Sequence, residues 1–578
     1  MHSEEIARPA ILMLGENSLE TAERIRTALG EADIFGLQTR VETADIPFSD
    51  FGGTLRELYE AGRPIIAICA AGIVIRALAR LLEDKRAEPP VLAVAEDGSA
   101  VVPLLGGLSG VNDLARRIAA ALDVAPAITT TGELRFGTNL LHPPAGYTLA
   151  NPQAGKKFIA DLLAGEKVRL SGTAPWLSDT RLPIDPAGRL TITITPENRQ
   201  PKAGELLYHP RNIAIAIAIP GQKMANDNDA IFNDIDIILD KSGISRDAIA
   251  LFLALERDIA TPQIHAAAAK FNAPLRFVKD AGSTEALARL AVEKPVKLIT
   301  HSGLALAVAE TPADLVQAGR KRGRLAVVGL GPGDSALMAP AVRQELQRAE
   351  DILGYETYVR MAGPFRPDQV RHMTDNREEM QRARHAFALA ATGRSVAMVS
   401  SGDPGIFAMA AAILEALHLS DDPAWHGVEL VILPGISAAM AAAARIGAPL
   451  GHDFCILSLS DNLKPWAVIE QRLDHAARAD LAMAFYNPIS KARPWQLGQA
   501  LDIIRRHRQP QTPVVLGRDV GRPAEKVLVT SLGELTPDQV DMRTVVIIGS
   551  STTQRFERND GSEWVYTPRW YGEGRPSS

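Results

Sequence analysis

The chain has 578 residues, of which 46% are hydrophobic and 22% are charged, a balance typical of a soluble protein with several folded domains. Its 62 basic and 68 acidic residues give a net charge of −6, which argues against nucleic-acid binding by broad phosphate neutralisation. Two cysteines, Cys69 and Cys455, are too few for a disulfide framework or a four-cysteine metal site. No apolar run reaches the roughly 18 residues of a membrane-spanning helix, and the acidic start (Glu4, Glu5) is unlike a signal peptide. We therefore expect a cytoplasmic protein without membrane partners.

Short apolar runs alternate with helical patterns over residues 1–150. Pro9–Leu14 and Pro64–Cys69 predict buried strands, and Ile73–Leu82 predicts a helix. This alternation predicts a doubly wound α/β domain. Residues 151–210 change to Thr/Ile alternation punctuated by prolines, which indicates a small mixed insert.

A second α/β domain is expected over residues 211–318. Within it, Lys297–Thr300 predicts a strand and the residues from Leu304 onward predict a helix. The fold class expected is a multidomain α/β protein in which smaller α/β units precede a large C-terminal unit. The remaining boundaries are a basic, glycine-bearing linker at 319–323, the large unit at 324–556, and a partly ordered tail at 557–578.

Three glycine- and proline-rich turns follow apolar strand runs in the large unit. They are GLGPGD at 329–334, SSGDPG at 400–405 and LPGISAA at 433–439. Open α/β sheets build ligand clefts at the carboxyl ends of their strands, where glycine lets backbone groups approach a ligand. Pro332 and the missing third glycine exclude a dinucleotide fingerprint for the first turn. Asp403 can accept hydrogen bonds from ribose hydroxyls or an amino group.

These motifs resemble those of the tetrapyrrole-methyltransferase family, the S-adenosylmethionine-dependent enzymes of cobalamin and sirohaem synthesis. The similarity spans about residues 323–556 and includes FYNP at 485–488 and TVVIIG at 544–549. It implies a two-lobed tetrapyrrole-methyltransferase fold, a tetrapyrrole substrate and a homodimer. Segments similar to members that methylate C-17 of precorrin-3B and contract its macrocycle to precorrin-4 lie at 352–359, 447–461 and 486–496.

The resemblance also implies where S-adenosyl-L-methionine binds, as a co-substrate in a cleft between the lobes. Methyl transfer needs little acid–base assistance because the sulfonium is already an activated donor, so the protein mainly aligns the reacting atoms. The cofactor-binding residues expected by motif are Pro332, Ser401, Gly402, Asp403, Ile406, Ser437, Ala438, Asn487, Val514 and Val545.

Ring contraction is expected to begin with loss of a proton from a hydroxyl, which calls for a general base. A turn role for His452 and Asp453, and a helix-capping role for Asp461, remain open alternatives. Arginine and lysine side chains suit the carboxylates of the substrate, although each could also be a solvated surface group. The catalytic candidates are Asp461, His452 and Asp453, with Tyr486 as hydrogen-bonding partner. The substrate-binding candidates are Arg360, Arg493 and Lys491.

Part of residues 10–150 is similar to the cobalt-precorrin-5A hydrolase family, through AAGIVIRALARLLEDK at 70–85 and AITTTGE at 127–133. Leu108 stands where that family usually has histidine, and Pro220–Lys223 stands where it commonly has Gly-Cys-Arg. We therefore expect a non-catalytic module that holds or passes tetrapyrroles, with other cobalamin-pathway enzymes as partners. The alternative is a bifunctional enzyme that also opens the lactone. Polar groups that could line a tetrapyrrole pocket are Asn112, Asp113, Thr129, Thr130, Thr131 and Glu133.

The number of cysteines also indicates which route of cobalamin synthesis the resemblance implies. Ring-contracting relatives with an iron–sulfur cluster need several cysteine ligands, which Cys69 and Cys455 cannot supply. The resemblance therefore implies the oxygen-dependent chemistry, with no metal site and no iron–sulfur cluster.

Overall fold

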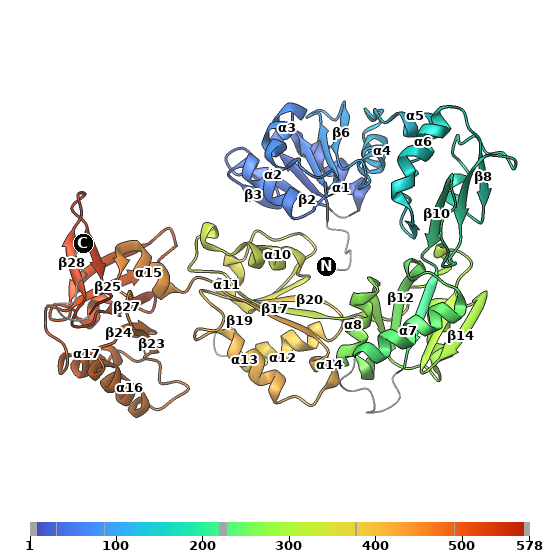
Figure 1. Cartoon of the computed structure of the whole chain (residues 1–578). Helices are drawn as coiled ribbons and strands as arrows, with labels where there is room; N and C mark the ends of the chain where they lie inside the picture. Colours follow the sequence, from blue (N-terminus) through green and yellow to red (C-terminus); the bar gives the residue numbers. More distant parts are fainter. Residues whose placement is uncertain are drawn as a thin grey trace. The chain divides into compact units, whose positions relative to one another are not determined.

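The computed structural model describes residues 8–30, 32–85, 87–218, 228–375, 379–490 and 492–570. The chain forms two compact units, each described below by itself (Figure 1). No helix within these described ranges is long and apolar enough to cross a membrane. The first unit comprises Met1–Arg322, Pro364–Asp368 and Asp422–Gly427, and the second comprises Gly323–Gly363, Gln369–Asp421 and Val428–Ser578.

The first unit opens with a six-stranded sheet that carries helices on both faces. Its strand order is β3-β2-β1-β4-β5-β6, and β6 alone is antiparallel to its neighbour. Alternate residues of β1 face opposite ways: Ile11 and Met13 pack with α1 and α4, whereas Ala10 and Leu12 pack with α2 and α3. This arrangement confirms the predicted doubly wound layer. The bounds are β1 Ala10–Met13, α1 Leu19–Leu29, β2 Asp33–Leu37, β3 Ile46–Phe48, α2 Phe51–Glu60, β4 Ile65–Ile68, α3 Ala71–Leu78, β5 Val91–Val94, β6 Val101–Leu105 and α4 Val111–Leu122.

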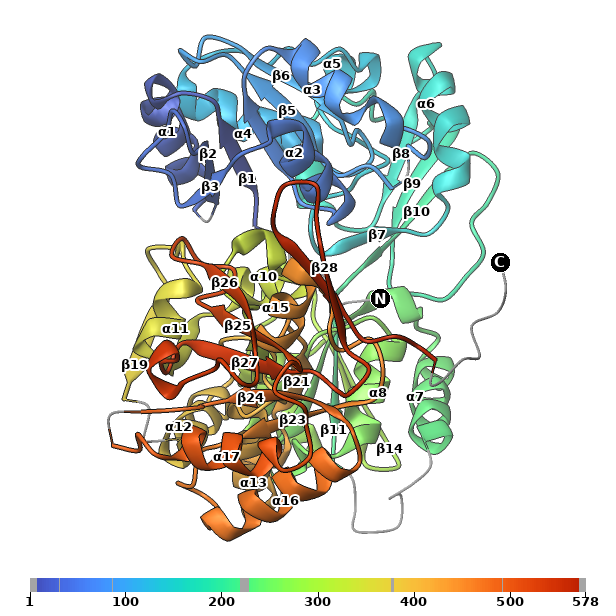
Figure 2. The ribbon, with the colours of Figure 1, turned by 90° about the vertical axis from the view of Figure 1, so that its left-hand side faces the viewer.

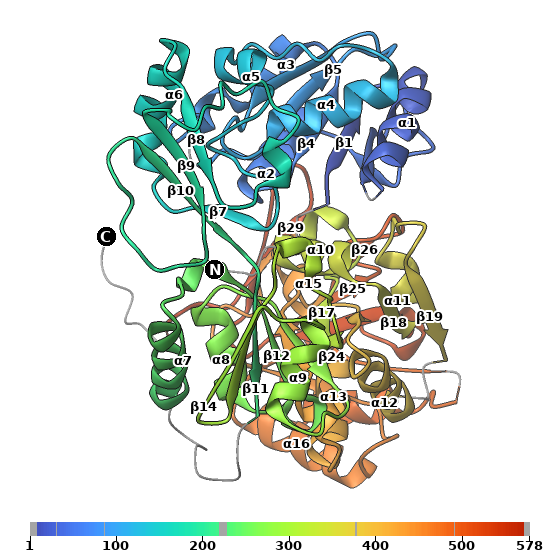
Figure 3. The same ribbon diagram turned by 90° about the vertical axis from the view of Figure 1, so that its right-hand side faces the viewer.

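Two further sheets complete the first unit (Figure 3). One has the order β7-β10-β9-β8, and the other has the order β14-β15-β11-β12-β13-β16. The four-stranded sheet and the helices beside it in sequence have the bounds α5 Thr131–Phe136, β7 Tyr147–Leu149, α6 Gly155–Leu163, β8 Val168–Ser171, β9 Leu190–Ile194 and β10 Glu205–Pro210. The second includes β11 Ile213–Ile217, α7 Asn228–Ser242, β12 Ile249–Leu255, α8 Pro262–Lys270, β13 Leu275–Val278, α9 Thr284–Ala291, β14 Lys297–His301, β15 Leu304–Val308 and β16 Arg320–Lys321.

One local prediction for this region was wrong. The residues from Leu304 form strand β15 instead of a helix, because Ser302 and Gly303 both have positive φ and make a two-residue hairpin turn after β14. The boundary between the two units falls within the predicted linker at 319–323, and two of its residues, Arg320 and Lys321, form strand β16, which pairs with β13. The Arg320 guanidinium supports this strand by donating to the Glu256 carboxylate at 2.8 Å.

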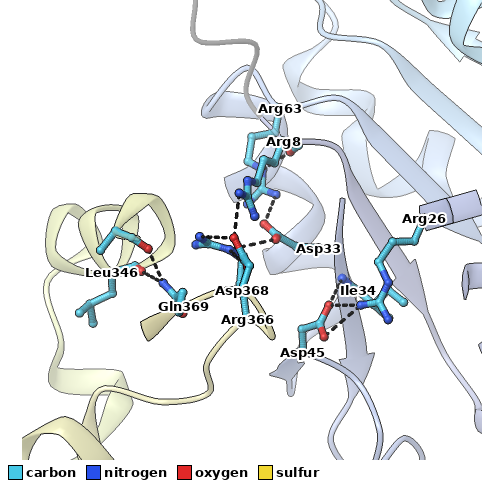
Figure 4. Close-up of polar contacts among 11 residues, drawn as sticks. Arg8, Arg26, Asp33, Ile34, Asp45, Arg63, Leu346, Arg366, Asp368 and Gln369 are labelled. Carbon is cyan, nitrogen blue, oxygen red and sulfur yellow. Dashed lines mark hydrogen bonds and ion pairs between the residues drawn. The ribbon is translucent and has the colours of Figure 1, made fainter. Parts of the chain in front are cut away.

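A network of charged side chains lies where β2 begins in the first unit (Figure 4). Asp33 is 3% exposed, accepts a hydrogen bond from Arg63 at 2.7 Å, and lies 3.9 Å from the Arg366 guanidinium. Arg366 and Arg8 also contact Asp368, at 3.1 and 3.0 Å. Burial alone would raise the pKa of Asp368, but hydrogen bonds from Arg366 and Arg8 outweigh it and lower the pKa to about 2. Ion pairs thus fix the loop that carries Arg366 and Asp368 within the first unit.

The second unit begins with a five-stranded parallel sheet in the order β19-β18-β20-β17-β21. Its central strands are continuously apolar because helices cover both faces, as is usual for parallel sheets. The bounds are β17 Arg324–Gly329, α10 Pro340–Arg348, β18 Asp351–Tyr355, α11 Glu356–Met361, β19 Val370–Thr374, α12 Glu379–Ala390, β20 Ser395–Ser400, α13 Met409–His418, β21 Glu429–Leu433 and α15 Ala438–Ile446. A short helix of the first unit, α14 Pro423–His426, interrupts this run.

A mixed sheet in the order β23-β24-β27-β25-β26 forms the second lobe of this unit (Figure 2). Helices α16 and α17 pack on one face and α15 packs on the other. The predicted tail contains a strand, β29, which pairs with β22 and β28 and buries Val565; residues 571–578 lie outside the described ranges. The bounds are β22 Gly447–Ala448, β23 Phe454–Ser458, α16 Trp466–Arg478, β24 Ala482–Tyr486, α17 Gln496–Arg505, β25 Pro513–Arg518, β26 Lys526–Ser531, β27 Thr544–Ile548, β28 Gln554–Glu557 and β29 Glu563–Tyr566.

Candidate methyl-transfer site

The three glycine-rich turns predicted from the sequence meet at the carboxyl ends of β17, β20 and β21. Strand β17 lies between the other two and pairs with both in parallel, so the three strands end at the same edge. The Gly402 amide donates to the Gly331 carbonyl at 2.7 Å, and the Gly331 amide donates back at 3.2 Å. A side chain at Gly435 would place its Cβ 2.2 Å from the Gly402 carbonyl oxygen. Only glycine therefore lets the third turn approach the second this closely.

Asp403 ties the second turn to the third. One of its carboxylate oxygens accepts a hydrogen bond from the Gly405 amide at 2.8 Å, and the other accepts one from the Gly435 amide at 3.1 Å. Each carboxylate oxygen has a second lone pair, so both can still accept a hydrogen bond from a ligand. The side chain is half-buried and therefore remains accessible to one.

The first turn is in contact with the connection between β25 and β26. The Arg522 guanidinium donates to the Pro332 carbonyl at 3.3 Å. A Cβ on Gly521 would lie 2.9 Å from the Pro332 ring, so the backbone of this connection packs directly on the first turn. No local sequence motif points to Arg522, because its contact with Pro332 joins two segments 190 residues apart.

Helix α15 begins directly after the third glycine-rich turn. Two hydroxyl groups accept hydrogen bonds from backbone amides in the first turn of this helix. The Ser437 hydroxyl accepts a hydrogen bond from the Met440 amide at 3.4 Å, in the manner of an N-cap. The Tyr486 hydroxyl, at the end of β24, accepts one from the Ala439 amide at 2.9 Å. Because that bond uses a lone pair of Tyr486, its O–H proton remains available for another acceptor.

Several predicted residues gather at the carboxyl ends of β23 and β24. Ser458 pairs with Tyr486 across the two strands, and the Asn487 amide donates to the Ser458 hydroxyl at 3.1 Å. Asp461 follows Ser458 and accepts a hydrogen bond from Arg493 at 3.0 Å. That hydrogen bond lowers the pKa of Asp461, so the carboxyl stays ionised at neutral pH. Tyr486, Asn487, Asp461 and Arg493 therefore share one edge of the second lobe.

His452 lies apart from this group. It precedes β23, whereas Asp461 follows it, so the two side chains are at opposite ends of a strand about 16 Å long. Its ring Nδ1 accepts a hydrogen bond from the Asp453 amide at 2.7 Å. This contact supports the alternative interpretation of His452 and Asp453 as turn residues, and the structure does not bring His452 together with Tyr486.

The remaining candidates fall into three groups. Val545 faces α15, but the side chain of Val514 is buried on the opposite face of the sheet, in the core with α16 and α17. Val514 is fully buried and its backbone pairs with β26 and β27, so the structure does not bring it to the site. The side chain of Arg360 is 70% exposed and pairs with Glu356 on the same helix. Lys491 lies outside the described residues.

Phe407 follows the second turn and is a further residue that sequence reasoning missed. Its ring centroid lies 5.7 Å from that of Tyr486, although Phe407 lies in the loop after β20 and Tyr486 ends β24 of the other sheet. The motif SSGDPGIF contains this residue, but no periodicity or spacing predicts its contact with the second lobe.

The polar residues proposed for a pocket in the first unit pair largely with one another. Glu133, only 4% exposed, accepts hydrogen bonds from Asn112 at 2.8 Å and from Arg116 at 2.7 Å. Asn112 also donates to Thr130 at 3.2 Å. Pro220–Lys223, the second departure from the hydrolase pattern, lies outside the described residues. Within the described ranges, no group of three or more His, Cys, Asp or Glu side chains is arranged to hold a metal ion.

The fold and these joined turns define the large unit as a two-lobed α/β methylase. A family model described as "Tetrapyrrole (Corrin/Porphyrin) Methylases" matches residues 324–536, and one described as "Cobalamin synthesis G N-terminal" matches residues 53–133. A precorrin-3B C(17)-methyltransferase of Sinorhizobium sp is 53% identical over 250 residues, which cover 43% of this chain and 97% of that protein. The chain therefore belongs to the tetrapyrrole methylase family, as a homologue of precorrin-3B C(17)-methyltransferase, and the predicted resemblance is confirmed.

Two further comparisons each cover less than half of the chain. The cobalamin biosynthesis protein CobIJ of Mycobacterium tuberculosis is 48% identical over 267 residues, which cover 45% of this chain and 51% of that protein. The chain thus spans about half the length of CobIJ. A crystal structure of the methyltransferase CobJ is 50% identical, covers 43% of this chain and 100% of its own, and has a TM-score of 0.40.

Proposed function

We propose that the second unit transfers a methyl group from S-adenosyl-L-methionine to C-17 of precorrin-3B and contracts the macrocycle. The products would be precorrin-4 and S-adenosylhomocysteine, in cobalamin biosynthesis. The observation that carries the proposal is the joined set of three turns, in a chain that is homologous to precorrin-3B C(17)-methyltransferase over 97% of that enzyme's length.

The geometry of the turns fits the methyl donor. A Cβ added at Gly402 would meet the Ser437 backbone at 3.6 Å, an ordinary van der Waals distance, so the second turn packs less tightly there than at Gly435. Asp403 could receive ribose hydroxyls or the amino group of the donor. When bound, the donor supplies a methyl group activated by the sulfonium, which the chain needs only to align with the acceptor carbon. The residues that would hold it are Pro332, Ser401, Gly402, Asp403, Ile406, Ser437, Ala438, Asn487 and Val545. Val514 is left out because it is fully buried between two paired strands.

Acid–base assistance to ring contraction would come from the edge that carries Asp461 and Tyr486. Asp461 is the carboxylate on this edge that would accept the proton leaving the hydroxyl of the extruded carbon. The Tyr486 O–H could donate a hydrogen bond to the same oxygen as negative charge develops on it. His452 is omitted from this role because it lies at the other end of β23. Arg493 and Arg360 would contact carboxylates of the substrate, and Lys491 stays a prediction.

The decisive experiment is anaerobic incubation of the full chain with precorrin-3B and S-adenosyl-L-methionine, followed by mass spectrometry. We expect one methyl group per turnover, an equal amount of S-adenosylhomocysteine, and a contracted macrocycle. Consumption of neither substrate by a folded protein would refute the proposal. A methylated product with an uncontracted ring would retain the transferase but reject the rearrangement.

For the first unit we propose a non-catalytic role in holding or passing tetrapyrroles. The Asn112 amide already donates to the Glu133 carboxylate, so fewer polar groups remain for the substrate or for a hydrolytic water. Leu108, at 37% exposure, offers an apolar contact in place of a titratable group. Incubation with cobalt-precorrin-5A should release no acetaldehyde, and stoichiometric release would instead support the bifunctional alternative. The homodimer and the contacts with other pathway enzymes stay predictions.

A further inference from the structure

Phe407 has a backbone conformation that large apolar residues rarely adopt. Its φ is +54°, in the left-handed region where the Cβ crowds the following carbonyl. The conformation is held by the turn itself: the Ile406 amide donates to the Asp403 carbonyl at 3.2 Å, and Asp403 in turn binds the Gly405 amide. A strained residue in a braced turn beside a ligand site points to a functional role. The other non-glycine residues with positive φ in the described ranges are all polar: Asp123, Asn272, Ser302, Asp480, Asn487 and Asp519.

Core packing does not explain this residue. The Phe407 side chain is 51% exposed, whereas most phenylalanine side chains lie inside proteins. Part of its ring packs on Tyr486, with 5.7 Å between the centroids and 57° between the planes. This tilted contact holds the ring in place and leaves its remaining surface free for a ligand.

Other apolar side chains are exposed nearby in the structure. Ile436 and Met440, each 40% exposed, flank Ser437 at the start of α15. The Tyr486 hydroxyl binds the Ala439 amide on the same helical turn, so Phe407 and this turn both contact Tyr486. Phe407 and this helical turn thus both lie against Tyr486, a residue of the proposed acid–base edge, and both expose apolar side chains. A broad apolar ring system matches such side chains better than a sulfonium or a ribose does.

We propose that Phe407 is a specificity-determining residue whose ring packs on the face of the tetrapyrrole macrocycle. The proposal rests on the proposed function, because it assigns the macrocycle and not the methyl donor to this ring. The strained backbone fixes the height and angle of the ring before the substrate arrives, which reduces the entropy lost on binding.

The test compares the full-length wild type with Phe407→Gly, Phe407→Asn and Phe407→Tyr. Glycine and asparagine both tolerate positive φ and remove the ring, whereas tyrosine keeps an aromatic face. Precorrin-3B binding is titrated anaerobically by absorbance in the presence of S-adenosylhomocysteine. Binding of S-adenosylhomocysteine itself and the melting temperature are measured separately.

We expect Phe407→Gly and Phe407→Asn to weaken precorrin-3B binding about tenfold, in line with the loss of one aromatic packing contact. Phe407→Tyr should stay within about threefold of the wild type, and affinity for S-adenosylhomocysteine should be unchanged in all three. Phe407→Gly and Phe407→Asn each test the proposal by themselves. If one of them folds poorly, the other still provides the test.

Unchanged precorrin-3B binding in a folded ring-removing variant would overturn the inference. Weaker binding of S-adenosylhomocysteine alone would also overturn it and would assign the ring to the methyl donor. The proposed function is judged separately, by methyl transfer in the wild type. If the wild type methylates precorrin-3B and the ring-removing variants bind precorrin-3B as well as the wild type does, only the role of Phe407 is refuted.

Discussion

Replacement of Asp403 by asparagine tests whether the joined turns preform the site for the methyl donor. In the wild type, both carboxylate oxygens accept backbone amides, from Gly405 at 2.8 Å and from Gly435 at 3.1 Å. An asparagine side chain has one acceptor oxygen, so one of these amides would face an NH2 group. Loss of one hydrogen bond to a charged group is worth about 1.5–3 kcal/mol. If the whole loss falls on the bound state, S-adenosylhomocysteine should bind about 10- to 150-fold more weakly.

Isothermal titration calorimetry of the full chain with S-adenosylhomocysteine measures this effect. Asp560→Asn is the matched control, because Asp560 accepts a backbone amide from Ser562 at 3.0 Å in an exposed turn of the same unit. We expect the control to bind like the wild type. If Asp403→Asn lowers the melting temperature but leaves the affinity unchanged, Asp403 merely stabilises the fold, and the reasoning about the donor site is refuted.

Three further predictions concern backbone packing, pH and buried charge. Gly435→Ala places a Cβ 2.2 Å from the Gly402 carbonyl, so S-adenosylhomocysteine binding should become undetectable by calorimetry; wild-type affinity would contradict the close approach. Hydrogen bonds from its arginine partner lower the pKa of Glu205 from 4.5 to about 2, so its stabilisation is complete above pH 4.5 and is lost as the pH falls toward 2. Between pH 6 and pH 3.5 the free energy of unfolding of the wild type should therefore fall by about 1.4 kcal/mol more than that of Glu205→Gln. Urea unfolding at the two pH values measures this, and an equal fall for the wild type and the variant would contradict it. Asp33→Asn leaves the buried Arg63 without its carboxylate and should destabilise the first unit by about 3–5 kcal/mol in urea unfolding; a loss below about 1 kcal/mol would show that the network is well solvated.

Local sequence patterns predicted the parts of the site that belong to one strand and its following turn. The apolar run before GLGPGD predicted a buried strand ending in a tight turn, and β17 ends there. The same pattern held for the turns after β20 and β21. By contrast, local patterning failed at Leu304, where Ser302 and Gly303 turn the chain and β15 pairs with β14 and with the distant β11.

By itself, the sequence determined the α/β class, the three turns and the membership of the methylase family, because each depends on residues close together in the chain. Only the tertiary structure separated Asp461 from His452, since a strand of five residues carries its two ends to opposite edges of a sheet. It also brought Tyr486 to the first turn of α15 and Phe407 onto Tyr486. Those contacts join segments 47 and 79 residues apart, and no periodicity within either segment encodes them.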